Sequence, residues 1–196
     1  MTQTAAKTVV VTGFGPFGNF SRNPSSDIVD LLEKEGIEGL NLVLRKISVV
    51  YSEVGETVPA LWQEHKPDLV VHIGAHPVER TVKLEQQAFA HGYCRYDVNG
   101  SVPLNNSTCC ATDVPSLITT IDCARVAQQV SEKLKLADVK LEKSEDPGRY
   151  LCGFSYFLSL NQDVGKALFI HVPAFDEKCT LETVASIVRE GPEIVL

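Results

Sequence analysis

A cysteine and a histidine in the second half of the chain could form a nucleophile and its base. Cys152 follows the helix-breaking pair Pro147 and Gly148, and the apolar spacing after it is helical, so its thiol is expected near a helix N-terminus. Such a position stabilises a thiolate. His171 ends an apolar, strand-like run that Pro173 stops, which puts its imidazole at the edge of a sheet. The spacing permits a Cys-His pair, although a cysteine on an apolar helix and a histidine in an apolar strand are more often core residues.

Glu85 could be the third member of such a group. It lies in the segment TVKLE, which is predicted to be a strand directly after the loop that follows LVVHIG. A carboxylate in that place could orient the histidine and stabilise its protonated form. Taken alone, a glutamate on a strand is more often a residue that faces the solvent.

Neither a nucleotide cofactor nor a metal ion is expected. The segment GFGPFG at residues 13–18 follows a strand and has the glycine spacing of a dinucleotide-binding loop. Pro16 removes a backbone N–H that a phosphate would use, however, and the next helix is predicted to begin only near Asn23. The candidate zinc ligands do not have the usual ligand spacing; they are His91, Cys94, Cys109 and Cys110.

The same glycine-rich loop carries two aromatic rings, Phe14 and Phe17. Ligands of α/β proteins usually bind at the carboxyl ends of parallel strands, which is where this loop is expected. The rings could therefore contact a ligand, and the alternative is that both belong to the hydrophobic core.

The order of the elements predicts an α/β fold. Strand-like and helical patterns alternate, and the run LVVHIG is continuously apolar, as in a parallel strand that helices cover on both faces. Asn23, Pro24 and Gly36 are suited to the two ends of the first helix. The length suits one domain, 1–196, and residues 91–115 are predicted to form a long loop.

The composition disfavours several classes of function. Hydrophobic residues make up 44% and charged residues 22% of the chain, as in ordinary globular proteins. The formal net charge is -7, which argues against a nucleic acid or an anionic membrane as partner, since both need a basic face. No apolar stretch approaches about 18 residues, and the six cysteines are too sparse for a disulfide framework. We therefore expect a cytoplasmic protein with free thiols.

Several motifs, taken together, resemble the pyroglutamyl-peptidase I family of cysteine exopeptidases, the pyrrolidone-carboxylate peptidases. The matching segments are VVVTGFGPFG, followed by NPS, then the Leu84-Glu85 segment, GRYLCGF and FIHVP. Their order and spacing both fit, and the resemblance runs from about residue 8 to residue 173. Three separated motifs in register are much more specific than any one of them.

The resemblance implies a catalytic triad and a set of substrate-binding residues. Cys152 would be the nucleophile, His171 the general base and acid, and Glu85 the residue that orients His171. Arg95 looks like the family's site arginine, and Asp97 is a weaker match. The implied substrate-binding residues are Phe14, Phe17, Asn23 and Arg95.

The resemblance also implies the fold and the reaction. The fold would be a three-layer α/β/α sandwich with a central mixed, mostly parallel sheet. The reaction would be hydrolytic removal of the N-terminal L-pyroglutamyl residue from peptides, without a metal or a cofactor. A pyroglutamyl peptide is thus the expected partner, and the sequence leaves open whether the protein is a monomer or a homo-oligomer.

The chain departs from the family pattern at two positions, and either change could loosen the site. Ala90 stands where members usually carry Asn, and Gly153 stands where they carry Asn or Asp. These differences keep two alternatives open: a catalytically impaired relative that binds pyroglutamyl-type peptides, and another small amide hydrolase on the same fold. The chain also ends soon after Gly191 and Pro192, so a short last helix is expected.

Overall fold

The computed structural model describes most of the chain, namely residues 6–17, 22–108 and 114–196. Gly18 of the glycine-rich loop and the adjacent Cys109 and Cys110 lie outside the described residues, so the interpretations that involve them are not taken further. Within the described ranges, no helix combines the length and the hydrophobicity that crossing a membrane requires.

A six-stranded sheet forms the centre of the molecule, with the strand order β2-β1-β3-β8-β4-β7. Strand β4 runs antiparallel to β8 and parallel to β7, and the other neighbouring pairs are parallel. The sheet is therefore mixed and mostly parallel, as predicted. The bounds are Lys7–Phe14 for β1, Leu40–Ile47 for β2, Leu69–Ala75 for β3, Thr81–Glu85 for β4, Lys140–Ser144 for β7 and Ala167–Val172 for β8.

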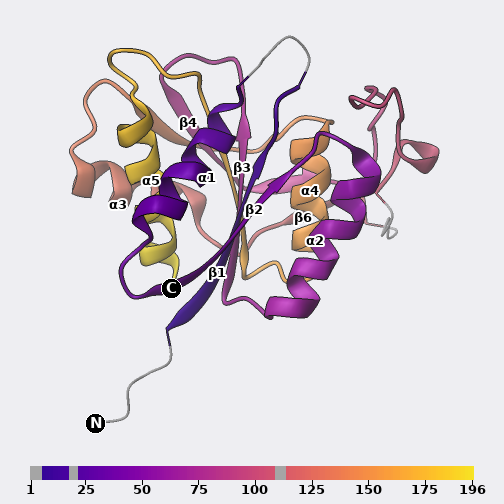
Figure 1. Ribbon diagram of the computed structural model, residues 1–196, viewed down its shortest axis with the longest axis horizontal. Helices are drawn as coiled ribbons and strands as arrows, with labels where there is room; N and C mark the ends of the chain where they lie inside the picture. The colour runs from indigo at the N-terminus through magenta and orange to yellow at the C-terminus, as the bar shows by residue number, and fades with distance from the viewer. Residues whose placement is uncertain (1–5, 18–21, 109–113) are drawn as a thin grey trace.

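Helices cover both faces of this sheet, which Figure 1 shows nearly edge-on. One face carries α1 (Pro24–Glu35), α3 (Cys123–Leu134) and α5 (Leu181–Val195), on the left of Figure 1. The other face carries α2 (Tyr51–His65) and α4 (Leu151–Leu160), on the right. The predicted three-layer α/β/α arrangement is confirmed.

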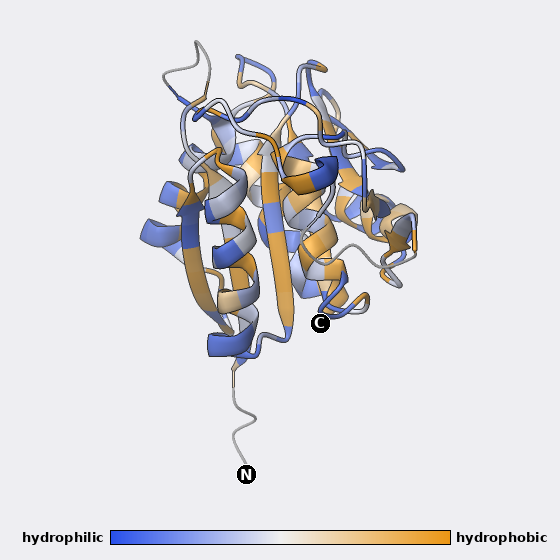
Figure 2. Ribbon diagram, turned by 90° about the vertical axis from the view of Figure 1, so that its right-hand side faces the viewer, coloured by the Kyte–Doolittle hydropathy of each residue, from blue (hydrophilic) through white to orange (hydrophobic). Residues whose placement is uncertain are grey.

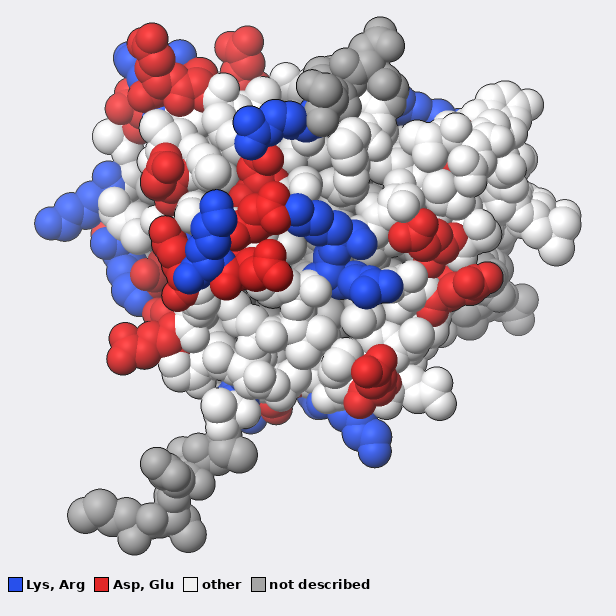
Figure 3. All heavy atoms as spheres, in the orientation of Figure 1, with Lys and Arg blue, Asp and Glu red and all other residues white. Residues whose placement is uncertain are grey.

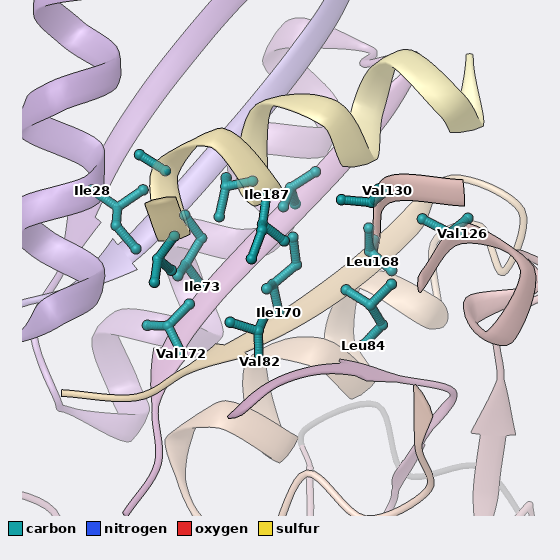
Figure 4. Close-up of a cluster of buried hydrophobic side chains, with 14 of the residues drawn as sticks. Ile28, Ile73, Val82, Leu84, Val126, Val130, Leu168, Ile170, Val172 and Ile187 are labelled. Carbon is teal, nitrogen blue, oxygen red and sulfur yellow. The ribbon is translucent and has the colours of Figure 1, made fainter. Parts of the chain in front are cut away.

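Strand β8 shows how the side chains divide between the two faces. Leu168 and Ile170 pack in the hydrophobic cluster under α1, α3 and α5, part of which Figure 4 shows. Ala167 and Phe169 belong to the second cluster, under α2 and α4. Because successive side chains of a strand point to opposite faces, His171 lies on the same face as Phe169, towards α4.

Helix α1 begins and ends where the sequence predicted. Asn23 is the N-cap, and its side-chain oxygen accepts a hydrogen bond of 3.1 Å from the backbone N–H of Ser25. Pro24 is the first helical residue, and Gly36, with a φ of 67°, ends the helix. A positive φ of this kind suits glycine because it has no Cβ.

The expectation of a short last helix was wrong. Helix α5 continues through Gly191 and Pro192 to Val195, and the N–H of Leu196 still bonds to the carbonyl of Pro192 at 3.0 Å. A proline inside a helix costs about 3 kcal/mol because it removes one hydrogen bond. Ile194 and Val195 pack against the first core cluster, and this burial of apolar surface favours continuing the helix.

A second, two-stranded sheet was not predicted. It pairs β5 (Gln87–Phe89) with β6 (Ser116–Ile118) in antiparallel order. Each strand has only three residues, which is too few for an alternating pattern to stand out in the sequence. Between them, the described part of the predicted long loop contains a single short 3-10 turn, η1 (Leu104–Asn106).

The surface agrees with the composition. Figure 2 shows long hydrophobic stretches on the strands and hydrophilic residues on the outer turns of the helices. On the face shown in Figure 3, Lys and Arg side chains are interspersed with Asp and Glu among the described residues, without a continuous basic area.

Candidate active site

Four neighbouring strands bring one residue each to the same level near one edge of the sheet. Gly74 of β3 pairs with His171 of β8, and His171 pairs with Lys83 of β4. Thr12 of β1 pairs with His72 of β3, so Phe14, two residues further along β1, is level with Gly74. Residues paired in this way have side chains on the same face. The sheet thus presents Phe14, Gly74, His171 and Lys83 in one row beneath the start of α4.

The thiol of Cys152 lies over Gly74. Cys152 is the second residue of α4, and a Cβ atom placed on Gly74 would be 2.6 Å from its Sγ. The same Cβ would be 2.8 Å from Cζ of Phe169. Real Cβ atoms do not approach other atoms so closely, so the space that the thiol occupies exists because residue 74 has no side chain.

His171 is joined to Glu85 by a buried hydrogen bond. The two atoms, Nδ1 of His171 and Oε1 of Glu85, are 2.7 Å apart, and Glu85 is fully buried. The backbone carbonyl of Glu85 accepts further hydrogen bonds from Tyr156 Oη at 2.8 Å and from Cys123 Sγ at 3.5 Å. The solvent-facing alternative for Glu85 is wrong, and its carboxylate leaves Nε2 of His171 free to face Cys152.

The surroundings of His171 favour its charged form. Burial lowers the pKa of the imidazole, but the charge and hydrogen bond of Cys152 and those of Glu85 raise it more, and the result is a pKa of about 9. An imidazolium next to a sulfur nucleophile stabilises the thiolate, as in other cysteine hydrolases. At neutral pH His171 is therefore expected to be an imidazolium, held by the Glu85 carboxylate beside the Cys152 thiol.

All seven site residues singled out in the sequence line one cavity of about 310 Å³. The Cys-His-Glu group contributes three of them, and the others are Phe14, Phe17, Asn23 and Arg95. These residues come from β1, the loop after it, β4, the long loop, α4 and β8. The fold brings them together at the edge of the sheet. In the described part of the chain no three His, Cys, Asp or Glu residues cluster as metal ligands would.

Phe14 and Phe17 differ in burial. Phe14 is only 3% exposed and belongs to the core cluster under α2 and α4 as well as lining the cavity. Phe17 is partly buried and lines the same cavity. The two alternatives for these rings, ligand contact and core, therefore both apply to Phe14, whereas Phe17 is the less buried of the two rings.

Asn23 also holds the first loop in place. Its side-chain N–H group donates to the carbonyl of Gly15 at 3.1 Å, while its oxygen accepts from the backbone and hydroxyl of Ser25. The hydroxyl of Ser25 accepts in turn from the N–H of Phe14 at 2.9 Å. Asn23 thereby connects the start of α1 to the loop that carries Phe17.

Arg95 lines the cavity with its guanidinium group over an aromatic ring. Its guanidinium carbon is 4.3 Å from the ring centre of Tyr150, and its backbone carbonyl accepts from Tyr51 Oη at 3.1 Å. Asp97 does not line this cavity. Its carboxylate accepts from the N–H groups of Tyr51, Asn99 and Ser101, so it shapes the loop that presents Arg95.

The two departures from the family pattern have different structural settings. Ala90 is fully buried in the core cluster and does not line the cavity. A Cβ atom on Gly153 would be 2.2 Å from the backbone oxygen of Gly148. The loop before α4 packs directly on the helix at Gly153, so in this chain the missing side chain permits a close contact and does not leave an open space.

Sequence reasoning missed several residues of the cavity. His76 packs the edge of its ring on His171, with ring centres 5.7 Å apart. Its Nε2 donates to the carbonyl of Thr81 at 2.7 Å, and burial, followed by the charges of His171 and Lys83, lowers its pKa although Thr81 and Glu85 oppose this. His76 is therefore expected to be neutral next to a charged His171. Lys83 is a second missed residue of the cavity. It lies beside His171 because of the register of β4 against β8, which no local sequence pattern encodes.

Comparisons with known proteins point to one family. A family model described as "Putative pyroglutamyl peptidase PgaPase_1" matches residues 3–176. Human pyroglutamyl-peptidase 1 is 43% identical over 169 residues, which cover 85% of this chain and 79% of the human protein. The pyrrolidone-carboxylate peptidase of Pyrococcus furiosus is 27% identical over 175 residues, 87% of this chain and 82% of that protein.

The solved structures agree in fold. A mutant pyrrolidone carboxyl peptidase from Pyrococcus furiosus superimposes with a TM-score of 0.81 at 23% identity, over 96% of this chain and 97% of that chain. The pyroglutamyl peptidase I of Bacillus amyloliquefaciens gives 0.79 at 18% identity, over 94% of each chain. With a family model that matches most of its length and a relative at 43% identity, this chain belongs to the pyroglutamyl-peptidase I family.

Proposed function

We propose that the protein is a cysteine exopeptidase that hydrolyses the bond after the N-terminal L-pyroglutamyl residue of peptides. The observation that carries this proposal is the row at the edge of the sheet. One cavity contains three groups: the thiol of Cys152 over Gly74, the buried His171–Glu85 pair and an aromatic wall. This is the set of groups that acyl transfer to a thiol needs.

In the first step, the thiolate of Cys152 attacks the carbonyl carbon of the pyroglutamyl residue, and a tetrahedral oxyanion forms. Tyr150, the N-cap of α4, makes no side-chain cap, so the N–H groups of the first turn remain as donors for that oxyanion. Arg95, on the cavity wall, is the second candidate donor. Both contacts would strengthen as negative charge develops on the oxygen.

In the second step, His171 gives the proton on Nε2 to the leaving amine, and the C–N bond breaks. A thioester between pyroglutamate and Cys152 remains. His171, now neutral, takes a proton from water while the water oxygen attacks the thioester. Pyroglutamate leaves, the thiolate and imidazolium are restored, and Glu85 stabilises the charge on His171 throughout.

The cavity suits a small, uncharged ring. Pyroglutamate is a neutral lactam, so its selection depends on ring contacts and on hydrogen bonds to its amide. Phe14 and Phe17 supply the aromatic wall, on the β1 side of Cys152. A wall behind the lactam would also leave no room for a preceding residue, which makes the enzyme an exopeptidase.

The test of the proposed function is turnover of a pyroglutamyl amide of aminomethylcoumarin, followed by mapping of the thiol that inactivation modifies. We expect hydrolysis, loss of hydrolysis with limiting iodoacetamide, and alkylation of Cys152 before any other cysteine. Burial raises the pKa of Cys123 to about 12 and also raises that of Cys179, so both should react slowly. Cys94 is exposed and serves as the internal reference thiol.

Two outcomes would contradict the assignment. If alkylation of Cys94 alone abolished turnover while Cys152 remained unmodified, the nucleophile would be wrong. If the protein bound a pyroglutamyl peptide but did not hydrolyse it, the catalytically impaired alternative would replace the proposal. Hydrolysis of other N-terminal amides in preference to pyroglutamyl would favour the second alternative.

Phe17→Ala is expected to impair use of pyroglutamyl substrates while the protein stays folded. An aromatic contact made with the ligand is worth about 0.5–1.5 kcal/mol beyond area burial, so KM should rise by about 2- to 10-fold. Phe14→Ala should in addition lower the melting temperature, because Phe14 is a buried core residue. Steady-state kinetics and thermal denaturation of both variants check this. Unchanged KM in Phe17→Ala would remove Phe17 from the binding wall.

The proposal includes a single catalytic domain, 1–196, that acts in the cytoplasm. Unpaired, buried thiols such as Cys123 and Cys179 suit a reducing compartment. The expected partner is a pyroglutamyl peptide, and no nucleic acid or membrane partner is part of the proposal.

A further inference from the structure

The order of the strands indicates the direction in which a bound peptide crosses the site. Phe14 lies on β1, Cys152 over β3, His171 on β8 and Lys83 on β4, and these strands are neighbours in that order. Neighbouring strands are about 4.8 Å apart, so this row spans about 14 Å from β1 to β4. The pyroglutamyl ring is assigned to the β1 side.

The leaving nitrogen must lie at His171, because His171 protonates it. The residue that follows pyroglutamate is attached to that nitrogen. It therefore continues past β8 and over β4, away from Phe14. The side chain that β4 presents there is Lys83, which is paired with His171 in the antiparallel ladder and lines the cavity.

Lys83 is half-buried and has no counter-ion among the described residues. Its neighbours Val82 and Leu84 belong to the core cluster on the other face, so Lys83 and Glu85 share the face of the site. No hydrogen bond or ion pair joins Lys83 to any described residue. Because Lys83 lines the cavity, its ammonium group can form an ion pair with a carboxylate of a bound ligand.

The other charged groups that line the cavity have contacts or roles of their own. Glu85 bonds to His171 through Oε1, while its buried Oε2 has no hydrogen-bond partner among the described residues. Asp146 accepts from Arg149 at 2.7 Å and from the N–H of Gly148 at 3.0 Å. Arg95 stacks on Tyr150 and is the second candidate donor for the oxyanion at Cys152. His76, which also faces Lys83, has a pKa that burial and neighbouring positive charge lower, so it is expected to be neutral. On the β4 side, Lys83 is thus the charge available to a ligand.

We propose that Lys83 binds a carboxylate on the residue that follows pyroglutamate, and that it gives the enzyme a preference for substrates with a negative charge at that position. This inference rests on the proposed function and names the substrate class. The carboxylate has two possible sources: the side chain of Asp or Glu, or the free C-terminus of a pyroglutamyl dipeptide. Lys83 acts on specificity and takes no part in bond making or breaking.

The two sources are separated with four substrates. Pyroglutamyl-Glu-amide and pyroglutamyl-Gln-amide differ only in side-chain charge. Pyroglutamyl-Ala and pyroglutamyl-Ala-amide differ only in C-terminal charge. We expect wild-type kcat/KM to favour the charged member of at least one pair by about 3- to 10-fold at low ionic strength, as for a charge pair that is partly exposed. The preference should shrink as ionic strength rises from about 0.02 M to 0.5 M, because salt screens the interaction.

The variants Lys83→Gln, Lys83→Arg and Lys140→Gln test the residue itself. Lys83→Gln should abolish the preference by lowering kcat/KM on the charged substrates more than on their neutral partners, while Lys83→Arg should keep the preference because it keeps the charge. Lys140→Gln is the matched control, since Lys140 lies on the adjacent strand β7, is exposed and does not line the cavity. It should behave like the wild type.

Each result has a clear meaning. A wild type without preference in either pair, or equal loss on charged and neutral substrates in Lys83→Gln, would overturn the role of Lys83 while the proposed function stands. Failure of the wild type on all four substrates would overturn both. Calorimetry with Cys152→Ala checks binding separately from turnover: the charged peptides should bind more tightly than their neutral partners, and Lys83→Gln in the same background should remove that difference.

Discussion

Glu85→Gln should reduce turnover by about 10²- to 10⁴-fold, the range seen when the residue that orients a catalytic histidine loses its charge. In the folded protein Glu85 Oε1 accepts a hydrogen bond of 2.7 Å from Nδ1 of His171. A glutamine keeps the size but can present an N–H there, and a donor facing Nδ1 favours the tautomer with the proton on Nε2. That tautomer cannot accept the proton of Cys152, so the thiolate would form less readily.

The pH dependence gives a second readout of the same variant. His171 has a raised pKa of about 9, so wild-type kcat/KM should fall above about pH 9, where the imidazolium loses the proton that the leaving amine needs. Glu85 is one of the causes that raise this pKa. Removing its charge therefore lowers the pKa of His171, and the alkaline limb should move to lower pH.

Controls separate this effect from unfolding. Glu85→Gln should still bind a pyroglutamyl peptide, since Glu85 acts on His171 and the aromatic wall lies on β1. Binding is measured by calorimetry and folding by thermal denaturation. Near-normal turnover across neutral pH, with an unshifted alkaline limb, would mean that Cys152 and His171 work as a dyad or with another partner.

The sequence predicted the layers of this fold because each element carries its own signal. The apolar run in β3 indicated a strand covered on both faces, and Asn23 with Pro24 marked the start of α1. The short strands β5 and β6 had no such signal, since three residues cannot establish an alternation. Helix α5 was misjudged because local helix breakers are visible in the sequence, whereas the core that Ile194 and Val195 pack against is not.

The site was predictable only where its residues carry a motif. Cys152, His171 and Glu85 lie in three segments that resemble a known family, and the structure gathers them in one cavity. Lys83 belongs to the same row only because β4 inserts antiparallel beside β8, and the order of strands in a sheet is not visible in local patterns. Gly74 likewise looks like an ordinary strand residue until the helix that crosses it is placed.

Gly74→Ala is expected to impair catalysis strongly although it adds a single methyl group. The new Cβ would lie 2.6 Å from Sγ of Cys152 and 2.8 Å from Cζ of Phe169, so the thiol, the ring or the strand must shift. Displacing a reacting group by about 1 Å can cost about 10²-fold in rate, and we expect kcat/KM to fall by about that factor. Alkylation of Cys152 should slow relative to Cys94, the exposed thiol in the same molecule.

A control must separate displacement of the thiol from general loss of stability. Gly55 lies inside α2 with nothing within 4 Å of an added Cβ, so Gly55→Ala should leave activity unchanged and raise the free energy of unfolding by about 0.5–1 kcal/mol. In the double variant Gly74→Ala/Phe169→Leu, the smaller leucine removes the close contact between the phenylalanine ring and the new methyl group. The double variant should therefore recover part of the melting temperature that Gly74→Ala loses. The methyl group would still occupy the place of the thiol, so kcat/KM and the alkylation rate should stay low. If Gly74→Ala alone kept kcat/KM and the alkylation rate of Cys152 within about 2-fold of the wild type, Cys152 would not need the space above Gly74. The position assigned to the nucleophile would then be wrong.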